Sequence, residues 1–222
     1  MNVAILNFSP NVGKTIIAKN LLMPRLPFKY ISLESIYYNP DIHESDIKID
    51  IEDFFQLQLI LSREHNILVD IGSSELENFF KQLEEYDEGY EDYDYFIVPI
   101  TPNKSSLFGS LKTLKELIRI GVDSKKIRFV FNKMQSTDDL SFHIEFADEI
   151  TIADAFGIPR PSIGITFNSI YSEVTANHLN LQQVMDYFKT NETKNKNFHF
   201  TKQSVLHACG NLDLVFRDMN LK

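Results

Sequence analysis

Short apolar runs rich in branched and aromatic residues recur along the chain, and segments with helical periodicity separate them. These runs predict strands at about 2–7, 30–33, 67–71, 95–100, 127–131 and 162–166. The intervening periodicity predicts helices at about 13–22, 51–63, 75–86, 105–120, 141–156 and, more weakly, 181–188. Most of the predicted strands are apolar on both faces, which indicates a parallel sheet that is covered on both sides.

The regular alternation of strands and helices determines the fold class. Parallel strands joined by helices need right-handed crossovers, so the order predicts an α/β fold with a doubly wound, mostly parallel sheet and helices on both faces. Ligands of such sheets bind beyond the carboxyl ends of the strands. Residues that follow strands are therefore the first candidates for a functional site.

Composition narrows the class of protein. The chain has 222 residues, 43% of them apolar, which suits one large domain with a sizeable core. It has no apolar run of membrane-spanning length and no basic secretory preamble, and its single cysteine, Cys209, fits a reducing compartment, so we expect a cytoplasmic protein. A net charge of -9 argues against a protein that coats DNA, so any DNA contact should be local or through a partner.

The loop after the first predicted strand ends like a phosphate-binding loop. In the stretch ILNFSPNVGKTIIAKNLL (5–22), the tripeptide Gly13-Lys14-Thr15 opens the predicted helix, whose free N–H groups favour an anion. In the pattern G-x-x-x-x-G-K-[ST], Lys14 would reach the β- and γ-phosphates and the Thr15 hydroxyl would ligate Mg²⁺. Phe8 replaces the first glycine of that pattern. The alternative is a surface lysine beside a helix N-cap.

Two further strand ends carry residues that a nucleotide site needs. Asp70 ends the apolar run of HNILVDIGSS, where a Walker B aspartate holds the Mg²⁺ shell, and Gly72 leaves room for a backbone N–H near the γ-phosphate. Asn132, in KKIRFVFNKM, can pair with a purine edge by its amide. Gln135 stands where a guanine-specific motif has aspartate, which favours adenine. The alternatives are an aspartate that caps the next helix and a turn-forming asparagine.

The order of these segments resembles the ParA/MinD superfamily of P-loop ATPases, and within it StbB-type plasmid stability proteins. The similarity runs from position 2 to about 167 and is carried by NFSPNVGKT, LESI, VDIGSS, DYDYFIVPITP and GVDSKKIRFVFNKM. It implies an ATP-responsive homodimer that helps to distribute or position plasmid DNA. It also implies a small plasmid-encoded DNA-binding partner and, in some relatives, an influence on conjugation.

The resemblance also implies roles for individual residues. It places Lys14, Glu34 and Asp70 in catalysis, with Glu34 orienting the attacking water, and it assigns Thr15 and Asp70 to Mg²⁺. For Glu34 the alternative is a loop carboxylate paired with a nearby base. The residues implied to contact ATP are Ser9, Asn11, Val12, Gly13, Lys14, Thr15, Ile16, Gly72 and Asn132.

The loop departs from the superfamily at three positions. The deviant loop of these ATPases has a signature lysine at the position of Ser9 and glycines at the positions of Pro10 and Asn11. That lysine reaches the phosphates of the partner subunit, so its loss predicts slow hydrolysis without a partner. Asn11 tolerates a left-handed backbone and could preserve the tight bend. The alternatives are a non-hydrolysing nucleotide-binding scaffold and an ATP-dependent small-molecule ligase of the same fold.

The chain beyond position 188 differs from the rest in pattern and charge. A polar stretch precedes apolar residues at helical spacing, namely Val205, Cys209, Leu212, Val215, Phe216 and Met219. We therefore divide the chain into a P-loop nucleotide-binding domain, 1–188, and a polar linker with an amphipathic helix, 189–222, packed on the same domain. This tail carries six Lys and Arg against three Asp and Glu, so we expect any DNA contact of the chain to be indirect, or weak through this tail.

An acidic segment at 84–94, EEYDEGYEDYD, has seven carboxylates and three tyrosines in eleven residues. Such a run is typical of a solvated loop between a helix and a strand. The alternative is a surface that receives a basic partner.

Overall fold

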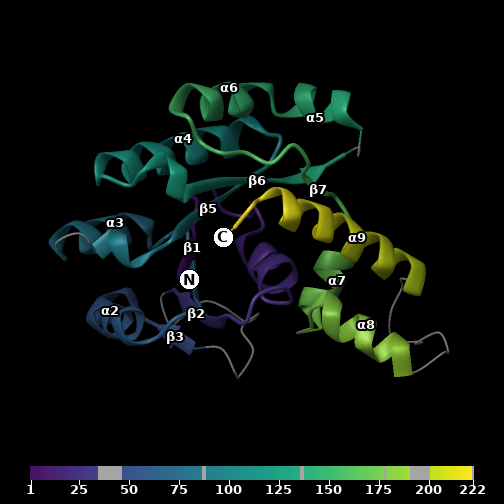
Figure 1. The fold of residues 1–222 in the computed structure, drawn as a ribbon, viewed down its shortest axis with the longest axis horizontal. Helices are drawn as coiled ribbons and strands as arrows, with labels where there is room; N and C mark the ends of the chain where they lie inside the picture. The colour runs from purple at the N-terminus through teal and green to yellow at the C-terminus, as the bar shows by residue number, and fades with distance from the viewer. Residues whose placement is uncertain (35–46, 87–88, 136–137, 178, 191–200, 222) are drawn as a thin grey trace.

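The computed structural model describes residues 1–34, 47–86, 89–135, 138–177, 179–190 and 201–221, and these contain one seven-stranded sheet (Figure 1). The strands are β1 (Val3–Ile5), β2 (Lys29–Leu33), β3 (Ile47–Ile49), β4 (Ile67–Ile71), β5 (Tyr95–Ile100), β6 (Ile127–Met134) and β7 (Ile165–Thr166). Their order is β3-β2-β4-β1-β5-β6-β7, and every neighbouring pair is parallel. The predicted doubly wound α/β fold is confirmed.

Strand β1 lies near the middle of the sheet, between β4 and β5. Ile5 is level with Asp70 on one side and with Ile97 on the other. Because all three strands run in the same direction, the loops that follow them meet at one edge. The register therefore brings the phosphate-loop motif and the predicted Walker B aspartate together.

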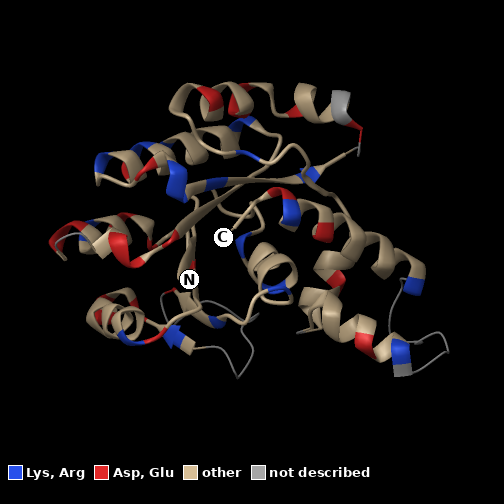
Figure 2. Cartoon of the chain, in the orientation of Figure 1, with Lys and Arg blue, Asp and Glu red and all other residues tan. Residues whose placement is uncertain are grey.

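Helices lie between most of the consecutive strands in the described part of the chain. They are α1 (Lys14–Ile16), η1 (Ile17–Leu22), η2 (Ile51–Asp53), α2 (Phe54–Arg63), α3 (Leu76–Glu85), η3 (Gly89–Asp92), α4 (Lys104–Arg119), η4 (Ser124–Lys126), α5 (Asp139–Glu145), α6 (Ala147–Phe156), α7 (Ile170–Ala176), α8 (Leu181–Thr190) and α9 (Lys202–Asp218). Figure 2 places Lys, Arg, Asp and Glu mainly on helices and loops, which leaves the sheet largely apolar.

The core has two layers, one on each face of the sheet. In β1, Ala4 faces a cluster with the apolar sides of α2 to α6, whereas Val3 and Ile5 face a cluster with η1, α7, α8 and α9. Successive strand side chains point to opposite faces, so a strand buried on both sides must be apolar throughout. This explains the continuous apolar runs in the sequence.

Several predicted elements need correction. The single helix predicted at 141–156 is broken at Phe146, which has φ -118° and ψ 25° and packs its buried ring 4.6 Å from that of Phe131, measured between centroids. Strand β3 and helix α7 were not predicted, because three and seven residues are too few for a clear period. The predicted strand at 162–166 is reduced to two residues, and β6 continues to Met134.

Helix α9 covers the open edge of β7. The Asn211 side chain accepts a hydrogen bond from the Thr166 N–H at 3.1 Å and donates to the Gly164 carbonyl at 3.1 Å. The apolar side of the helix is buried, with Val205, Ala208, Leu212 and Val215 at most 1% exposed. The polar linker predicted before it lies largely outside the described residues. Within the described ranges, no helix combines the length and apolar character needed to cross a membrane.

In the described part of the acidic segment 84–94, the three tyrosines pack against the hydrophobic core. Tyr93 is fully buried, and Tyr86 and Tyr90 pack against the core from its surface. Two positions of the segment, 87 and 88, lie outside the described residues. Its aromatic residues therefore belong to the core, and docking of a basic partner on its carboxylates stays a prediction.

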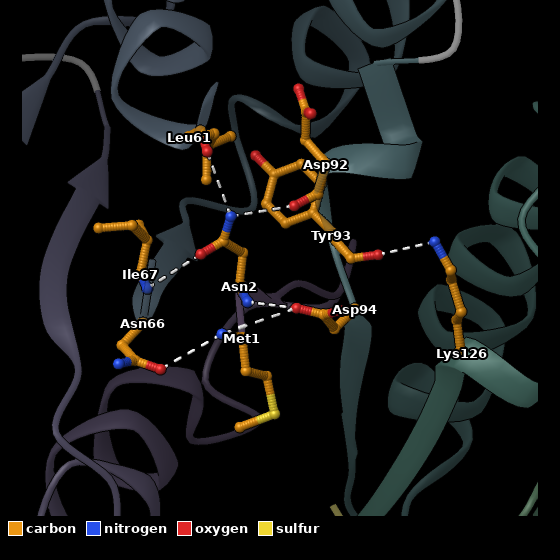
Figure 3. Close-up of polar contacts among 9 residues, drawn as sticks. All are labelled: Met1, Asn2, Leu61, Asn66, Ile67, Asp92, Tyr93, Asp94 and Lys126. Carbon is orange, nitrogen blue, oxygen red and sulfur yellow. Dashed lines mark hydrogen bonds and ion pairs between the residues drawn. The ribbon is translucent and has the colours of Figure 1, made fainter. Parts of the chain in front are cut away.

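Asn2 ties the amino-terminal edge of the sheet together (Figure 3). Its Oδ1 accepts from the Ile67 N–H at 3.2 Å, its Nδ2 donates to the Asp92 carbonyl at 3.1 Å, and its N–H donates to Asp94 Oδ2 at 2.6 Å. The residue is 6% exposed. With a further contact from its Nδ2 to the Leu61 carbonyl at 3.5 Å, this one side chain satisfies backbone groups from three other segments.

We expect Asn2→Ala to lower the free energy of unfolding by about 2 to 4 kcal/mol, because each buried polar group left without a partner costs about 1 to 3 kcal/mol. Urea denaturation would measure the change. The control is Asn177→Ala, which removes an exposed side chain and should change stability by less than about 0.5 kcal/mol. Equal stability of Asn2→Ala and the wild type would contradict this role for Asn2.

Candidate functional site

The loop between β1 and α1 bends through two residues with positive φ. Asn11 has φ 59°, as its tolerance of the left-handed region predicted, and Gly13 has φ 93°. A Cβ atom on Gly13 would lie 2.3 Å from Nδ2 of Asn132. Glycine at position 13 is therefore required both by the backbone angle and by the close approach of β6.

Lys14, Thr15 and Asp70 converge at the carboxyl edge of the sheet. The Thr15 hydroxyl donates to Asp70 Oδ2 at 2.7 Å, and Lys14 Nζ donates to the Ser73 hydroxyl at 2.6 Å. Asp70 is 3% exposed. The structure thus places Lys14, the predicted phosphate-binding cation, beside Thr15 and Asp70, the two residues predicted to hold Mg²⁺. All three lie where β1 and β4 end.

Burial and charge act against each other in this cluster. Burial lowers the pKa of Lys14, while the negative charges of Asp70 and Glu34 raise it. Burial raises the pKa of the Asp70 carboxyl, whereas the Thr15 hydrogen bond and the Lys14 charge lower it. The charged forms of Lys14 and Asp70 therefore stabilise each other, and a change in the charge of one would shift the pKa of the other.

Tyr30 is a member of this cluster that the sequence did not single out. Its hydroxyl donates to Asp70 Oδ2 at 2.9 Å, the same oxygen that Thr15 contacts, and the residue is 5% exposed. Lys19 lies over the Tyr30 ring, with Nζ 5.1 Å from the ring centroid. Tyr30 comes from β2, so only the strand order, with β2 next to β4, could have placed it here.

Asn132 lies beneath the loop. Its Nδ2 donates to the Val12 carbonyl at 2.8 Å and its Oδ1 accepts from the Lys133 N–H. Lys133 Nζ donates to the Asn11 carbonyl at 2.7 Å. This pair near the end of β6 therefore fixes the shape of the loop, and contact of Asn132 with a purine stays a prediction.

Gly72 and Glu34 mark the close contact between the loops that follow β4 and β2. A Cβ atom on Gly72 would lie 2.8 Å from Cγ of Glu34, and the Gly72 N–H donates to the Leu33 carbonyl at 2.9 Å. The N–H of Gly72 itself is therefore occupied by β2. The negative charge of Glu34 raises the pKa of Lys14, and a role of Glu34 in orienting water stays a prediction.

The donor set fits Mg²⁺ held jointly with phosphate. A hydroxyl and a carboxylate oxygen lie 2.7 Å apart at the carboxyl edge, and oxygen ligands are those that Mg²⁺ prefers. No group of three His, Cys, Asp or Glu side chains within the described ranges could hold a metal by itself. Mg²⁺ commonly binds through one or two side chains and the phosphates of its nucleotide.

Ser9, at the position of the superfamily's signature lysine, points into the protein. It is 6% exposed, its hydroxyl donates to the Ser105 carbonyl at 2.9 Å, and its N–H donates to Asn7 Oδ1 at 2.7 Å. A Cβ atom on Gly109 would lie 2.0 Å from the Ser9 hydroxyl oxygen. The loop is therefore packed on α4 through Ser9.

Solved structures with a similar fold are known. The chain aligns with an ATP complex of a variant of McdA from Cyanothece at TM-score 0.56 and 12% identity, over 100% of this chain and 96% of that one. A protein designated as a plasmid partition protein from Borrelia burgdorferi B31, bound to AMPPNP, aligns at 0.56 and 14%, over 97% and 98%. The MinD cell division protein of Aquifex aeolicus aligns at 0.51 and 15%, over 99% and 97%.

These neighbours confirm that the chain has the ParA/MinD P-loop ATPase fold. No family model and no curated protein sequence matches the chain. The narrower similarity to StbB-type proteins stays a prediction.

The packing of Ser9 makes a prediction about this position. We expect Ser9→Lys to lower the free energy of unfolding by about 1 to 3 kcal/mol, because a longer side chain overfills the contact with α4. The control is Ser62→Lys, on the exposed side of α2, which should be neutral. Urea denaturation of both variants would measure the difference. A Ser9→Lys variant as stable as the wild type would show that the loop can turn this side chain outward.

Proposed function

We propose that this chain binds Mg-ATP at the cluster formed by Lys14, Thr15 and Asp70 and acts as a slow ATPase of the ParA/MinD type. The observation that carries the proposal is the convergence of a lysine, a hydroxyl and a buried carboxylate at a helix N-terminus and a strand end. Anions bind at such termini because free N–H groups and the helix dipole attract them. The fold supports the same assignment.

Each residue has a distinct role in the proposal. Lys14 and the first N–H groups of α1, including those of Thr15 and Ile16, neutralise the phosphates, while Asp70 fixes the Thr15 hydroxyl and the metal shell. Mg²⁺, when bound, would supply positive charge to the phosphate oxygens. Glu34 orients the attacking water.

Slow turnover follows from the position of Ser9. In the proposal no lysine crosses from position 9 to a partner subunit, since the side chain there is buried against α4. Charge that develops in the transition state then lacks one stabilising cation, whereas ground-state binding by Lys14 remains. A partner protein would supply the missing charge, as an arginine finger does in other phosphoryl-transfer enzymes.

We further propose that the nucleotide state controls association of the chain with a second copy or with a small plasmid-encoded DNA-binding protein in the cytoplasm. Plasmid partition or stability, linked in some cases to conjugation, would be the outcome. The name of the Borrelia neighbour supports partition, and the resemblance to StbB-type proteins supports stability. DNA contact would be indirect, or weak through the basic tail.

A second candidate is a nucleotide-binding scaffold that does not hydrolyse ATP. The inward position of Ser9 favours it, because that packing leaves binding intact and removes a group that hydrolysis in the superfamily uses. Steady-state phosphate release, with and without a DNA-binding partner, separates the two candidates.

Lys14→Ala tests the binding site. We expect affinity for Mg-ATP to fall at least about tenfold, because hydrogen bonds to charged groups contribute about 1.5 to 3 kcal/mol. Titration calorimetry would measure the affinity. The control is Lys29→Ala, which removes an exposed lysine paired with Glu64 at the other end of the sheet and should bind as the wild type does. Equal affinity in Lys14→Ala and wild type would refute the phosphate-binding role.

Asp70→Asn tests the metal shell. We expect ATP affinity without Mg²⁺ to remain within about threefold of wild type, while the increase in affinity that Mg²⁺ produces is lost, since the amide cannot supply the charge that a divalent cation favours. The measurement is ATP binding across a Mg²⁺ titration, with Asp213→Asn, an exposed partner of Arg25, as control. A normal response to Mg²⁺ in Asp70→Asn would show that the aspartate has no part in metal binding.

A further inference from the structure

A groove lies between the first turns of α4 and the junction of α5 with α6. It has a volume of about 370 Å³, and its lining includes Asn103, Lys104, Leu107, Ile144, Glu145, Asp148 and Glu149. This volume is at the small end of ligand pockets, which span roughly 300 to 1,000 Å³, and is large enough for a long side chain. Figure 2 shows acidic positions on α5 and α6 and basic positions on α4.

Glu149 is the unusual residue of this groove. It is 5% exposed, yet within the described ranges no side chain of another residue donates a hydrogen bond to it, and Lys104 forms no ion pair with it. Burial raises the pKa of the Glu149 carboxyl, its own backbone N–H lowers it, and the negative charge of Asp148 raises it further. A buried carboxylate without a cation is costly, so such groups are generally paired or functional.

The other side of Glu149 cannot supply the missing charge. There the residue borders an apolar pocket, lined by Leu107, Phe129 and Ile152 among others, with no room for a water molecule. A cation can therefore reach the carboxylate only from the groove. Among the described residues that line the groove, Lys104 is the one cation against three carboxylates, so the lining has a negative balance.

We propose that this groove binds an arginine or lysine side chain of a protein partner, with the Glu149 carboxylate as its counter-ion. The apolar side chains of Leu107 and Ile144, the latter 69% exposed, suit the methylene stem of such a residue, whose charged end reaches the acid. Charge complementarity favours a basic segment over an acidic or neutral one.

The groove is joined to the nucleotide loop through α4. Lys104 and Leu107 line the groove, while Ser105 and Gly109 of the same helix hold Ser9. A partner that displaces the first turns of α4 would therefore move the loop. This coupling rests on the proposed function, whereas binding of the basic side chain does not.

Binding can be tested on the full chain without nucleotide, so that failure of ATP binding has no bearing on the result. Acetyl-arginine amide would be titrated against isotope-labelled protein and followed by amide resonances in NMR. We expect saturable shifts at the groove residues of α4, α5 and α6, and at least about tenfold weaker binding of acetyl-citrulline amide, its neutral analogue. No saturable shift at these positions, or equal binding of the two probes, would overturn the proposal.

Two variants make the test specific. Glu149→Gln should weaken binding of acetyl-arginine amide at least about tenfold. Asp148→Asn, which changes an exposed carboxylate of the same groove, should weaken this binding less than about threefold.

Glu149→Gln should also be at least as stable as the wild type in urea, because it removes an unpaired buried charge. A less stable variant that binds the probe normally would identify Glu149 as a helix-terminal structural residue and overturn the proposal. If the variant does not fold, the comparison of arginine with citrulline decides.

Discussion

The carboxyl edge of this protein is organised around one buried charge, the carboxylate of Asp70. A carboxylate at 3% exposure is stable only when donors and cations surround it, and here hydroxyl groups of Thr15 and Tyr30 and the ammonium of Lys14 do so. These partners come from β2 and from the helix that follows β1, whereas Asp70 itself lies in β4. Satisfying one charge therefore aligns three segments that are distant in sequence.

Contacts with neighbouring segments also explain how a loop without the usual glycines keeps its shape. Asn11 and Gly13 supply the left-handed bends, and the carbonyls of Asn11 and Val12 are held by the side chains of Lys133 and Asn132. Glycines would allow the bends by their conformational freedom, whereas here the contacts with β6 hold the loop in its bent shape. Ser9 then packs on α4, so the position that carries an outward cation in the superfamily makes a fixed inward contact here.

Much of this site could be predicted from the sequence, because its main residues carry local signals. Lys14 and Thr15 open a helix after an apolar strand, and Asp70 lies at the end of another, so strand ends alone were enough to place them. Tyr30 and Ser73 could not be found in this way. Their roles depend on which strands and loops are neighbours, and periodicity shows that a strand exists without showing what lies beside it. The break at Phe146 was missed for a similar reason, since ring packing against Phe131 overrides the helical period.

Two side chains that would meet a nucleotide, those of Lys14 and Thr15, already have protein partners. Lys14 is bonded to Ser73 and Thr15 to Asp70, so a ligand must exchange these hydrogen bonds rather than fill empty ones. Such an exchange yields little net free energy for a neutral ligand, because a typical hydrogen bond contributes only about 0.5 to 1.5 kcal/mol. A phosphate chain differs, since its charge interacts with a partly desolvated lysine and a helix N-terminus at once. In the proposed nucleotide site, these internal hydrogen bonds would therefore favour charged phosphates over nucleosides.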